Sequence, residues 1–222
     1  MNQNQTSRYI KYAIGEIILV VIGILIALSI NNWNEDRKAR QQEIKLVSQL
    51  LEDAKNDSIF YQSRLLLFNG QISTYRLLLN QCDGRMESND TITLRNETSP
   101  FTMAADQSIV MSNKIDYNDI SDEAIKRRLR DYALSYTYIT KAISNHSNLI
   151  SSEIRNLAKS RNLDFGNNEA KLTEFSVICD IPNIQGVLRL CLGYSQNAQE
   201  QAERFIANNE ALIVSCNDFF NN

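Results

Sequence analysis

The longest apolar stretch of the chain lies near its N-terminus. From Ile14 to Ile30 the only polar side chains are Glu16 and Ser29. Tyr12 and Trp33 flank this stretch, and roughly 30 Å of helix separates them, about the thickness of the hydrocarbon layer of a bilayer. The pattern therefore predicts a single transmembrane helix that runs from Tyr12 to Trp33.

Three other structures are compatible with part of this pattern. Arg8 and Lys11 form a basic N-terminal region, and small residues up to Ser29 resemble the cleavage site of a signal peptide. The helical pattern continues past Ser29 without a break, which favours a retained anchor. A buried core helix is disfavoured because the stretch is apolar on every face. A pilin-like stem is disfavoured because Glu16 follows Gly15 directly and no β-rich region follows.

The apolar stretch leads into a charged segment and then into a long amphipathic helix. Residues 34–43 form a charged collar of good helix formers with nothing to bury. Apolar positions then recur at steps of three and four, which indicates a helix with one buried face. The predicted seam is Ile44, Val47, Leu51, Ala54, Ser58, Tyr61, Leu65, Phe68, Ile72, Tyr75 and Leu79.

Further helices follow a polar loop that begins near Gly84. Pro100 predicts the start of a short helix that ends near Asn113, and Ser121 is the expected N-cap of a long one. Pro182 is expected to open the last long helix, after a short one over residues 169–179. The predicted seams are Ile125, Leu129, Tyr132, Tyr136, Ile139, Ile143, His146, Ile150, Ile154 and Leu157, and then Ile184, Val187, Cys191, Tyr194, Ala198, Ala202, Phe205, Asn209, Leu212, Cys216 and Phe219.

These patterns predict an all-α protein in which one transmembrane helix continues into a long antiparallel helical bundle. Two prolines and seven glycines in 222 residues suit long helices better than short strands with many turns. The expected organisation is a tail over residues 1–11, the anchor over 12–33, the collar over 34–43 and the bundle over 44–222. The long helices are expected to run up, down and up from the membrane.

That path leads to an expectation for the four cysteines. It places Cys82 and Cys216 at the far end of the bundle and Cys179 and Cys191 near the membrane. In an oxidising compartment, the predicted disulfides are therefore Cys82 with Cys216 and Cys179 with Cys191. Four reduced, buried thiols are the alternative.

No motif points to an enzyme, a metal or a cofactor. No C-x-x-C pair occurs, and the single histidine, His146, occupies a seam position that favours a satisfied core residue over a general base. The acidic stretch from Asp116 to Asp122 lacks the glycine of a calcium loop, so we expect it to form a turn and a helix cap. We therefore predict no catalytic, cofactor-binding or metal-binding residues.

The charge of the chain argues against binding to nucleic acid. Its formal net charge is -3, whereas nucleic-acid binders usually present a basic face. The basic run Lys126-Arg127-Arg128-Leu129-Arg130 is expected to be a solvated helix face that pairs with nearby acids.

One face of the predicted anchor has the composition of a helix-association stripe. Glu16, Gly23, Ala27 and Asn34 lie close to a common line along the helix, and Asn31 lies at its edge. Gly23 and Ala27 form a small-xxx-small pair, which allows another helix to approach closely within lipid. The pattern predicts association with a partner or with a second copy through this stripe, whereas solvation of Glu16 by the headgroup region is the alternative.

The N-terminal stretch closely resembles the start of a known family. The segments Tyr12-Ala13-Ile14-Gly15-Glu16-Ile17-Ile18 and Asn31-Asn32-Trp33-Asn34-Glu35 are similar to Bacteroidota membrane proteins of domain of unknown function 6090. Weaker similarity covers Ser112–Tyr132, where Asn113 replaces a family glycine. The resemblance implies a bacterial inner-membrane protein with its body in the periplasm, and it implies no activity. The basic residues after the span favour the opposite orientation, although that rule is weak for long domains.

The function expected from these patterns is that of a membrane-anchored helical interaction or scaffold module within a membrane complex. The long seams and the lack of a catalytic constellation favour this role over an enzyme. The alternative is a ligand-sensing periplasmic bundle that signals through a partner, because residues 1–11 are too short to form an output domain.

Overall fold

The computed structural model describes residues 3–85, 108–112, 117–149, 152–153, 156 and 176–221. All secondary structure in these residues is helical, which confirms the all-α prediction. Only the last part of the short helix predicted from Pro100 lies in the described residues, where it is seen as α2 (Ile109–Ser112). Ser99, Ile150, Ile154 and Leu157 lie outside the described residues.

The first helix, α1, runs without interruption from Gln3 to Cys82. The chain divides into two compact units, residues 1–47 and 48–222, and α1 contributes to both. In the first unit the large apolar side chains of α1 are exposed, from Ile14 at 51% to Trp33 at 64%. Among the described helices, α1 alone is long and apolar enough to cross a membrane, judged by length and composition.

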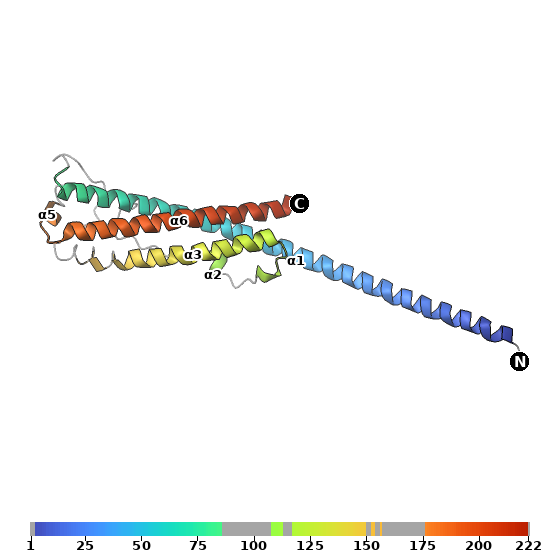
Figure 1. The fold of residues 1–222 in the computed structure, drawn as a ribbon. Helices are drawn as coiled ribbons and strands as arrows, with labels where there is room; N and C mark the ends of the chain where they lie inside the picture. Colours follow the sequence, from blue (N-terminus) through green and yellow to red (C-terminus); the bar gives the residue numbers. More distant parts are fainter. Residues whose placement is uncertain are drawn as a thin grey trace. The chain divides into compact units, whose positions relative to one another are not determined.

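In the described residues, the second unit is a bundle of three long helices. The C-terminal part of α1 packs with α3 (Glu123–Leu149) and α6 (Ile184–Asn221), which lie side by side in Figure 1. The short elements α2, η2 (Tyr117–Asp119) and α5 (Ser176–Cys179) complete the described part of this unit. The seam positions Ala54, Tyr61, Tyr75, Tyr132 and Phe205 are fully buried, because a step of three or four residues keeps one face of a helix against its neighbours.

The path of the chain through the bundle differs from the prediction. Asp57 of α1 meets Tyr132 of α3, and Phe68, further along α1, meets His146, further along α3. These two helices therefore run parallel, whereas α6 runs antiparallel to both, since Tyr61 contacts Phe205 and His146 contacts Ser195. The predicted up, down and up path is wrong. The connection from residue 83 to residue 122 is long enough to bring the chain back to the starting end before α3 begins.

The ends of the helices also differ from the prediction by one or two residues. Asp122, and not Ser121, caps α3, because its Oδ1 accepts hydrogen bonds from the N–H groups of Ala124 (2.8 Å) and Ile125 (3.0 Å). Pro182 lies in the turn before α6, two residues ahead of Ile184. Asn183 follows it in the left-handed region with a φ of 65°, which asparagine tolerates better than most residues.

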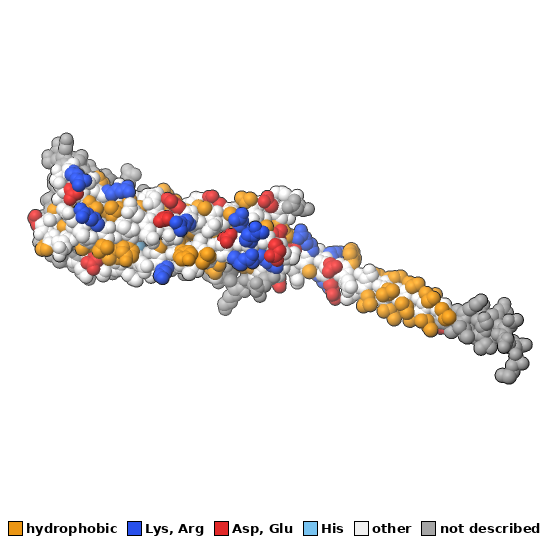
Figure 2. Space-filling view, in the orientation of Figure 1, with side chains coloured by type: hydrophobic (Ala, Val, Ile, Leu, Met, Phe, Trp, Pro, Cys, Tyr) orange, Lys and Arg blue, Asp and Glu red, His pale blue; other side chains and the backbone are white. Residues whose placement is uncertain are grey.

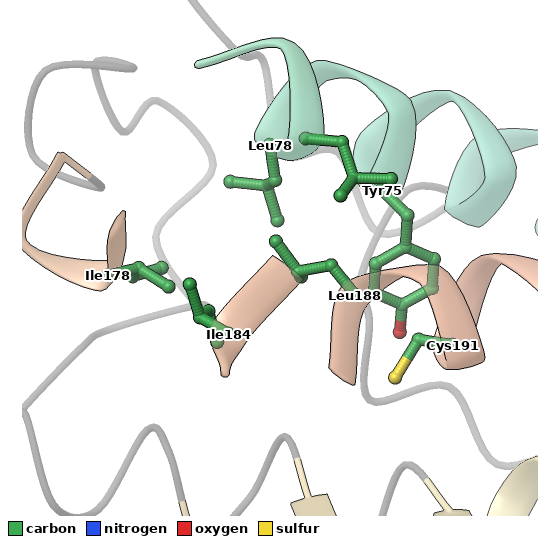
Figure 3. Close-up of a cluster of buried hydrophobic side chains, with 7 residues drawn as sticks. Tyr75, Leu78, Ile178, Ile184, Leu188 and Cys191 are labelled. Atoms are coloured by element: carbon green, nitrogen blue, oxygen red, sulfur yellow. The ribbon is translucent and has the colours of Figure 1, made fainter. Parts of the chain in front are cut away.

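The end of the bundle that includes α5 has its own apolar cluster (Figure 3). Tyr75 and Leu78 of α1 pack with Ile178 of α5 and with Leu188 and Cys191 of α6. A disulfide joins Cys82 to Cys179 beside this cluster, with 5.0 Å between the Cα atoms. The predicted pairs, Cys82 with Cys216 and Cys179 with Cys191, are wrong, because Cys82 and Cys179 share this end whereas Cys191 and Cys216 are free and buried.

Candidate functional site

A buried carboxylate is the centre of the polar contacts in the bundle core. Asp57 of α1 is fully buried. Its Oδ1 accepts a hydrogen bond from Ile109 N (2.7 Å), and its Oδ2 accepts from Val110 N (3.2 Å), Ser108 Oγ (2.8 Å) and Tyr132 Oη (2.5 Å). These four donors come from α3 and from the segment at α2. Asp57 therefore links α1 to two parts of the chain that lie more than 50 residues away.

Ser108 completes this arrangement from the start of α2. Its Oγ accepts a hydrogen bond from Met111 N at 3.0 Å, which is the geometry of an N-cap, and it lies 2.6 Å from Tyr132 Oη. The backbone N–H groups at the start of α2 point at the Asp57 carboxylate, so their partial positive charge stabilises it. The contacts hold the start of α2 against α1 and α3.

Two tyrosines lie beside buried carboxylates, Tyr132 beside Asp57 and Tyr117 beside Asp53, and both keep their protons at neutral pH. Burial and then the hydrogen bond to Asp57 raise the pKa of Tyr132 well above its ordinary value. Burial and the nearby Asp53 raise the pKa of Tyr117 to about 12, and Tyr117 Oη lies 3.5 Å from Asp53 Oδ2. The sequence did not reveal this network, because the one small polar side chain in the predicted seam of α1 is that of Ser58, which is only half-buried.

His146 is a buried histidine with a serine partner. Its Nε2 lies 3.0 Å from Ser195 Oγ, and the Ser195 hydroxyl donates to the carbonyl of Cys191 at 2.9 Å. The imidazole therefore donates through Nε2, and its ring packs edge-on against Phe68. Burial lowers the pKa of His146 to about 4, so the ring is neutral at pH 7. Ser195 is fully buried as well, and this geometry is that of a satisfied core histidine.

The free thiols are also enclosed by the core. Cys191 and Cys216 are fully buried, and burial raises the pKa of each to about 12. Both are therefore poor nucleophiles at neutral pH. In the part of the chain that the structure describes, no group of three or more His, Cys, Asp or Glu side chains is placed to hold a metal ion.

The residues of the predicted association stripe all lie on the exposed surface of α1. Glu16, Gly23, Ala27 and Asn31 are exposed, and Asn31 Nδ2 donates to Glu35 Oε1 at 2.9 Å. A Cβ added at Gly23 would meet no atom within 4 Å. The helix itself therefore does not require glycine at this position, and association through the stripe stays a prediction.

Two other predictions concerned residues at the start of α3. In the acidic stretch, Asp119 is exposed and Asp122 is the helix cap, whereas Asp116 lies outside the described residues. The basic run pairs in part with neighbouring acids, through Lys126 with Glu123 (3.1 Å) and Arg128 with Asp131 (3.9 Å). Both contacts are exposed i,i+3 pairs, which agrees with a solvated helix face.

The surface feature that stands out is a grooved face formed by α3 and α6, here named the α3/α6 face. Leu134 (58% exposed) and Tyr138 (56%) of α3 line one groove, and Leu190 (54%) and Tyr194 (39%) of α6 line a second. Figure 2 shows apolar patches separated by polar side chains on the side of the bundle where these helices lie. The other residues that line the two grooves are Asp131, Ser135, Arg189, Gly193, Asn197, Gln201, Arg204 and Asn208.

On α6 this face follows one continuous line. Leu190, Tyr194, Asn197, Gln201 and Arg204 recur at steps of three and four, which places them along one side of the helix. The sequence did not reveal the face, because Tyr194 falls in the predicted seam and spacing alone does not separate the buried tyrosines and leucines of α3 from the exposed ones. The pattern that could have predicted this face is a second apolar stripe, Leu134 and Tyr138, beside the seam residues of α3.

Comparison with known proteins adds one match. Residues 16–100 match the family described as a family of unknown function (DUF6090). The match includes most of the N-terminal stretch that carries the resemblance, covers the rest of α1 and continues to residue 100. The weaker similarity over Ser112–Tyr132 lies outside it. It supports a domain of unknown function in this part of the chain. No curated protein and no solved structure matches the chain.

Proposed function

We propose that this chain is a single-pass membrane protein whose helical body lies on the extracytoplasmic side and binds a protein partner through the α3/α6 face. The role is that of a docking or scaffold module within a membrane complex. The observation that carries the proposal is the α3/α6 face, where large apolar side chains lie exposed while the ionisable groups of the core are enclosed.

The apolar part of α1 supports the membrane anchor. Its side chains are exposed over the whole stretch, and a helix that is apolar on every face is stable in lipid and unfavourable in water. The flanking aromatic residue Trp33 is exposed and lies within reach of Arg37, 5.6 Å from its guanidinium carbon. This pairing of an aromatic ring with a basic group suits the interface between hydrocarbon and headgroups.

The disulfide supports the side of the membrane on which the body lies. Cys82 and Cys179 are 97 residues apart in the sequence and form a disulfide. Structural disulfides persist in oxidising compartments such as the bacterial periplasm and are rare in the cytosol. Together with the resemblance of the N-terminal stretch to an inner-membrane family, this contact supports an inner-membrane protein with a periplasmic body.

The composition of the α3/α6 face supports a protein as its ligand. Its aromatic and aliphatic side chains are separated by amides and single charges, as in the surfaces that proteins use to bind one another. The first groove is open and lies between α3 and α6, and the described residues of the second lie along α6, which suits a helical partner better than a small molecule. The ionisable groups of the core, Asp57 and His146, are sealed from these grooves by burial.

Site-specific photocrosslinking in native membranes tests this proposal. A photoreactive phenylalanine analogue replaces Tyr138 in the full-length chain, and a matched control replaces Ile59, an equally apolar residue of α1 that is 69% exposed. We expect a discrete protein adduct from position 138 that is absent from position 59. Leu134→Asp should remove most of that adduct, because it places a charge beside the apolar contact. Equal crosslinking at both positions, or crosslinking that Leu134→Asp leaves unchanged, would contradict the proposal.

A further inference from the structure

We infer that the partner of the α3/α6 face is a second copy of this chain, placed so that α3 of each copy packs against α6 of the other. This inference rests on the proposed function, because it assigns an occupant to the face described above.

The symmetry follows from the chain direction. A two-fold axis along the groove keeps the two bundles parallel, whereas an axis across the groove would reverse one of them. An axis along the groove also brings α3 of one copy opposite α6 of the other at the same height. Because α3 and α6 are antiparallel, the four helices would then form an alternating antiparallel bundle, which is a common arrangement.

The charges of the face match across such an axis. Tyr132 contacts Phe205 (4.9 Å between ring centroids) and His146 contacts Ser195. These two contacts show which residues of α3 and α6 lie at the same height along the bundle. Asp131 and Arg204 line the same groove, about one helical turn apart in height.

A second charged pair lies further along the groove. Lys141 of α3 is exposed two turns beyond Leu134, at about the level of Glu200 of α6. The symmetry therefore places Asp131 opposite Arg204 of the partner copy and Lys141 opposite Glu200 of the partner copy. Both contacts join opposite charges, and each occurs twice in the dimer.

The ion pairs that these charged side chains make within one chain are weak enough to be replaced by ion pairs between two copies. Arg204 contacts Glu200 at 2.5 Å and Asp131 contacts Arg128 at 3.9 Å within one chain. All four side chains are at least 44% exposed, and exposed ion pairs of this kind contribute only about 0–1 kcal/mol. Exchanging them for contacts between copies therefore costs little. Leu134 and Tyr138 lie between the charged residues and would be removed from water by the same contact.

Complementary charge reversal tests this arrangement. One full-length chain carries Asp131→Arg and a differently tagged chain carries Arg204→Asp, each with the photoreactive analogue at position 138. Alone, each variant places like charges opposite each other at two symmetric contacts. Mixed, the two variants restore opposite charges at both contacts. We expect the adduct between differently tagged chains to exceed either same-tag adduct by about three- to thirtyfold, since two contacts are reversed and each is worth a few tenths to about 1 kcal/mol.

Peptide mapping then identifies where the crosslink lies. The adduct of the unsubstituted pair, which carries only the analogue at position 138, should join it to the tryptic peptide that ends at Arg204 of the differently tagged copy. Equal amounts of same-tag and mixed-tag adducts from the charge variants would overturn the inference. An adduct with a different protein would also overturn it and would leave the proposed function standing. Absence of any adduct above the Ile59 control would overturn both.

Discussion

Asp57 of α1 and Tyr132 of α3 are joined by a 2.5 Å hydrogen bond in the core of the bundle. The residues are 75 positions apart, and the same carboxylate also accepts hydrogen bonds from Ser108 and from two N–H groups of α2. This carboxylate joins α1 to α3 and to the segment at α2. It is therefore a suitable place to test the path of the chain.

Asp57→Asn should destabilise the bundle by about 2–4 kcal/mol, because the amide turns one acceptor atom into a donor that faces existing donors. Urea denaturation of the full-length protein in detergent, followed by circular dichroism, measures the effect. The control Glu52→Gln changes an exposed carboxylate on the same helix and should stay within about 0.5 kcal/mol of the original chain. Equal effects of the two substitutions would contradict the position of Asp57 in the core.

His146 should make the stability of the bundle depend on pH. Its pKa is about 4 in the folded chain and 6.5 for an unperturbed histidine, so the unfolded chain binds the extra proton between these values. Stability is therefore complete above about pH 6.5, falls as the pH decreases, and levels off below about pH 4. At about 1.4 kcal/mol per pH unit, the loss is on the order of 3 kcal/mol.

His146→Gln provides the comparison for this pH dependence, because it keeps a polar group near Ser195 and does not titrate. Carboxylates contribute to the pH dependence of both proteins, so the relevant quantity is the difference between the two stability curves from pH 4 to pH 6.5. Parallel curves over this interval would show that His146 is not enclosed as described.

Removal of the disulfide should weaken the bundle without unfolding its core. Cys82→Ser, Cys179→Ser and the double variant should each lower the free energy of unfolding by about 3–5 kcal/mol, because the bond closes a loop of 97 residues. The double variant should be no less stable than either single one. Alkylation of the unfolded, unreduced protein followed by peptide mapping checks the pairing directly. Labelled Cys82, or a peptide that joins Cys82 to Cys216, would contradict the structure.

The stripe on the apolar part of α1 makes a separate prediction. Gly23→Ile should weaken association of the full-length chain in a membrane crosslinking assay, because it blocks the close approach of another helix. A Cβ at this position meets nothing within the chain, so the substitution leaves the helix itself intact. Leu25→Ile, on the other side of α1, is the matched control. If both variants associate equally well, the stripe has no role in association.

The sequence predicted the helices well because each has a regular apolar face. Phe68, Ile139 and Leu212 were assigned to seams from spacing alone, and all three are buried. The path was not predictable in the same way, because helix periodicity carries no information about which helices are neighbours. The polar contacts of the core were not predictable for a related reason. A lone aspartate such as Asp57 is typical of a helix surface, and its partners Ser108 and Tyr132 are distant in the sequence. The exposed Leu134 and Tyr138 became visible as a surface only once α3 and α6 were packed together.

The most direct test of the account is on which side of the membrane the start of α1 and the bundle lie. Cys191 and Cys216 are buried and Cys82 and Cys179 are joined, so a cysteine introduced at the exposed Gln196 is the reactive thiol of the folded chain. The full-length chain should stay in the membrane pellet after alkaline carbonate. A membrane-impermeant maleimide added to intact spheroplasts should label Gln196→Cys, and should label Asn4→Cys only after permeabilisation. Release of the chain by carbonate, or labelling of Gln196→Cys only after permeabilisation, would contradict an anchored protein with an extracytoplasmic body.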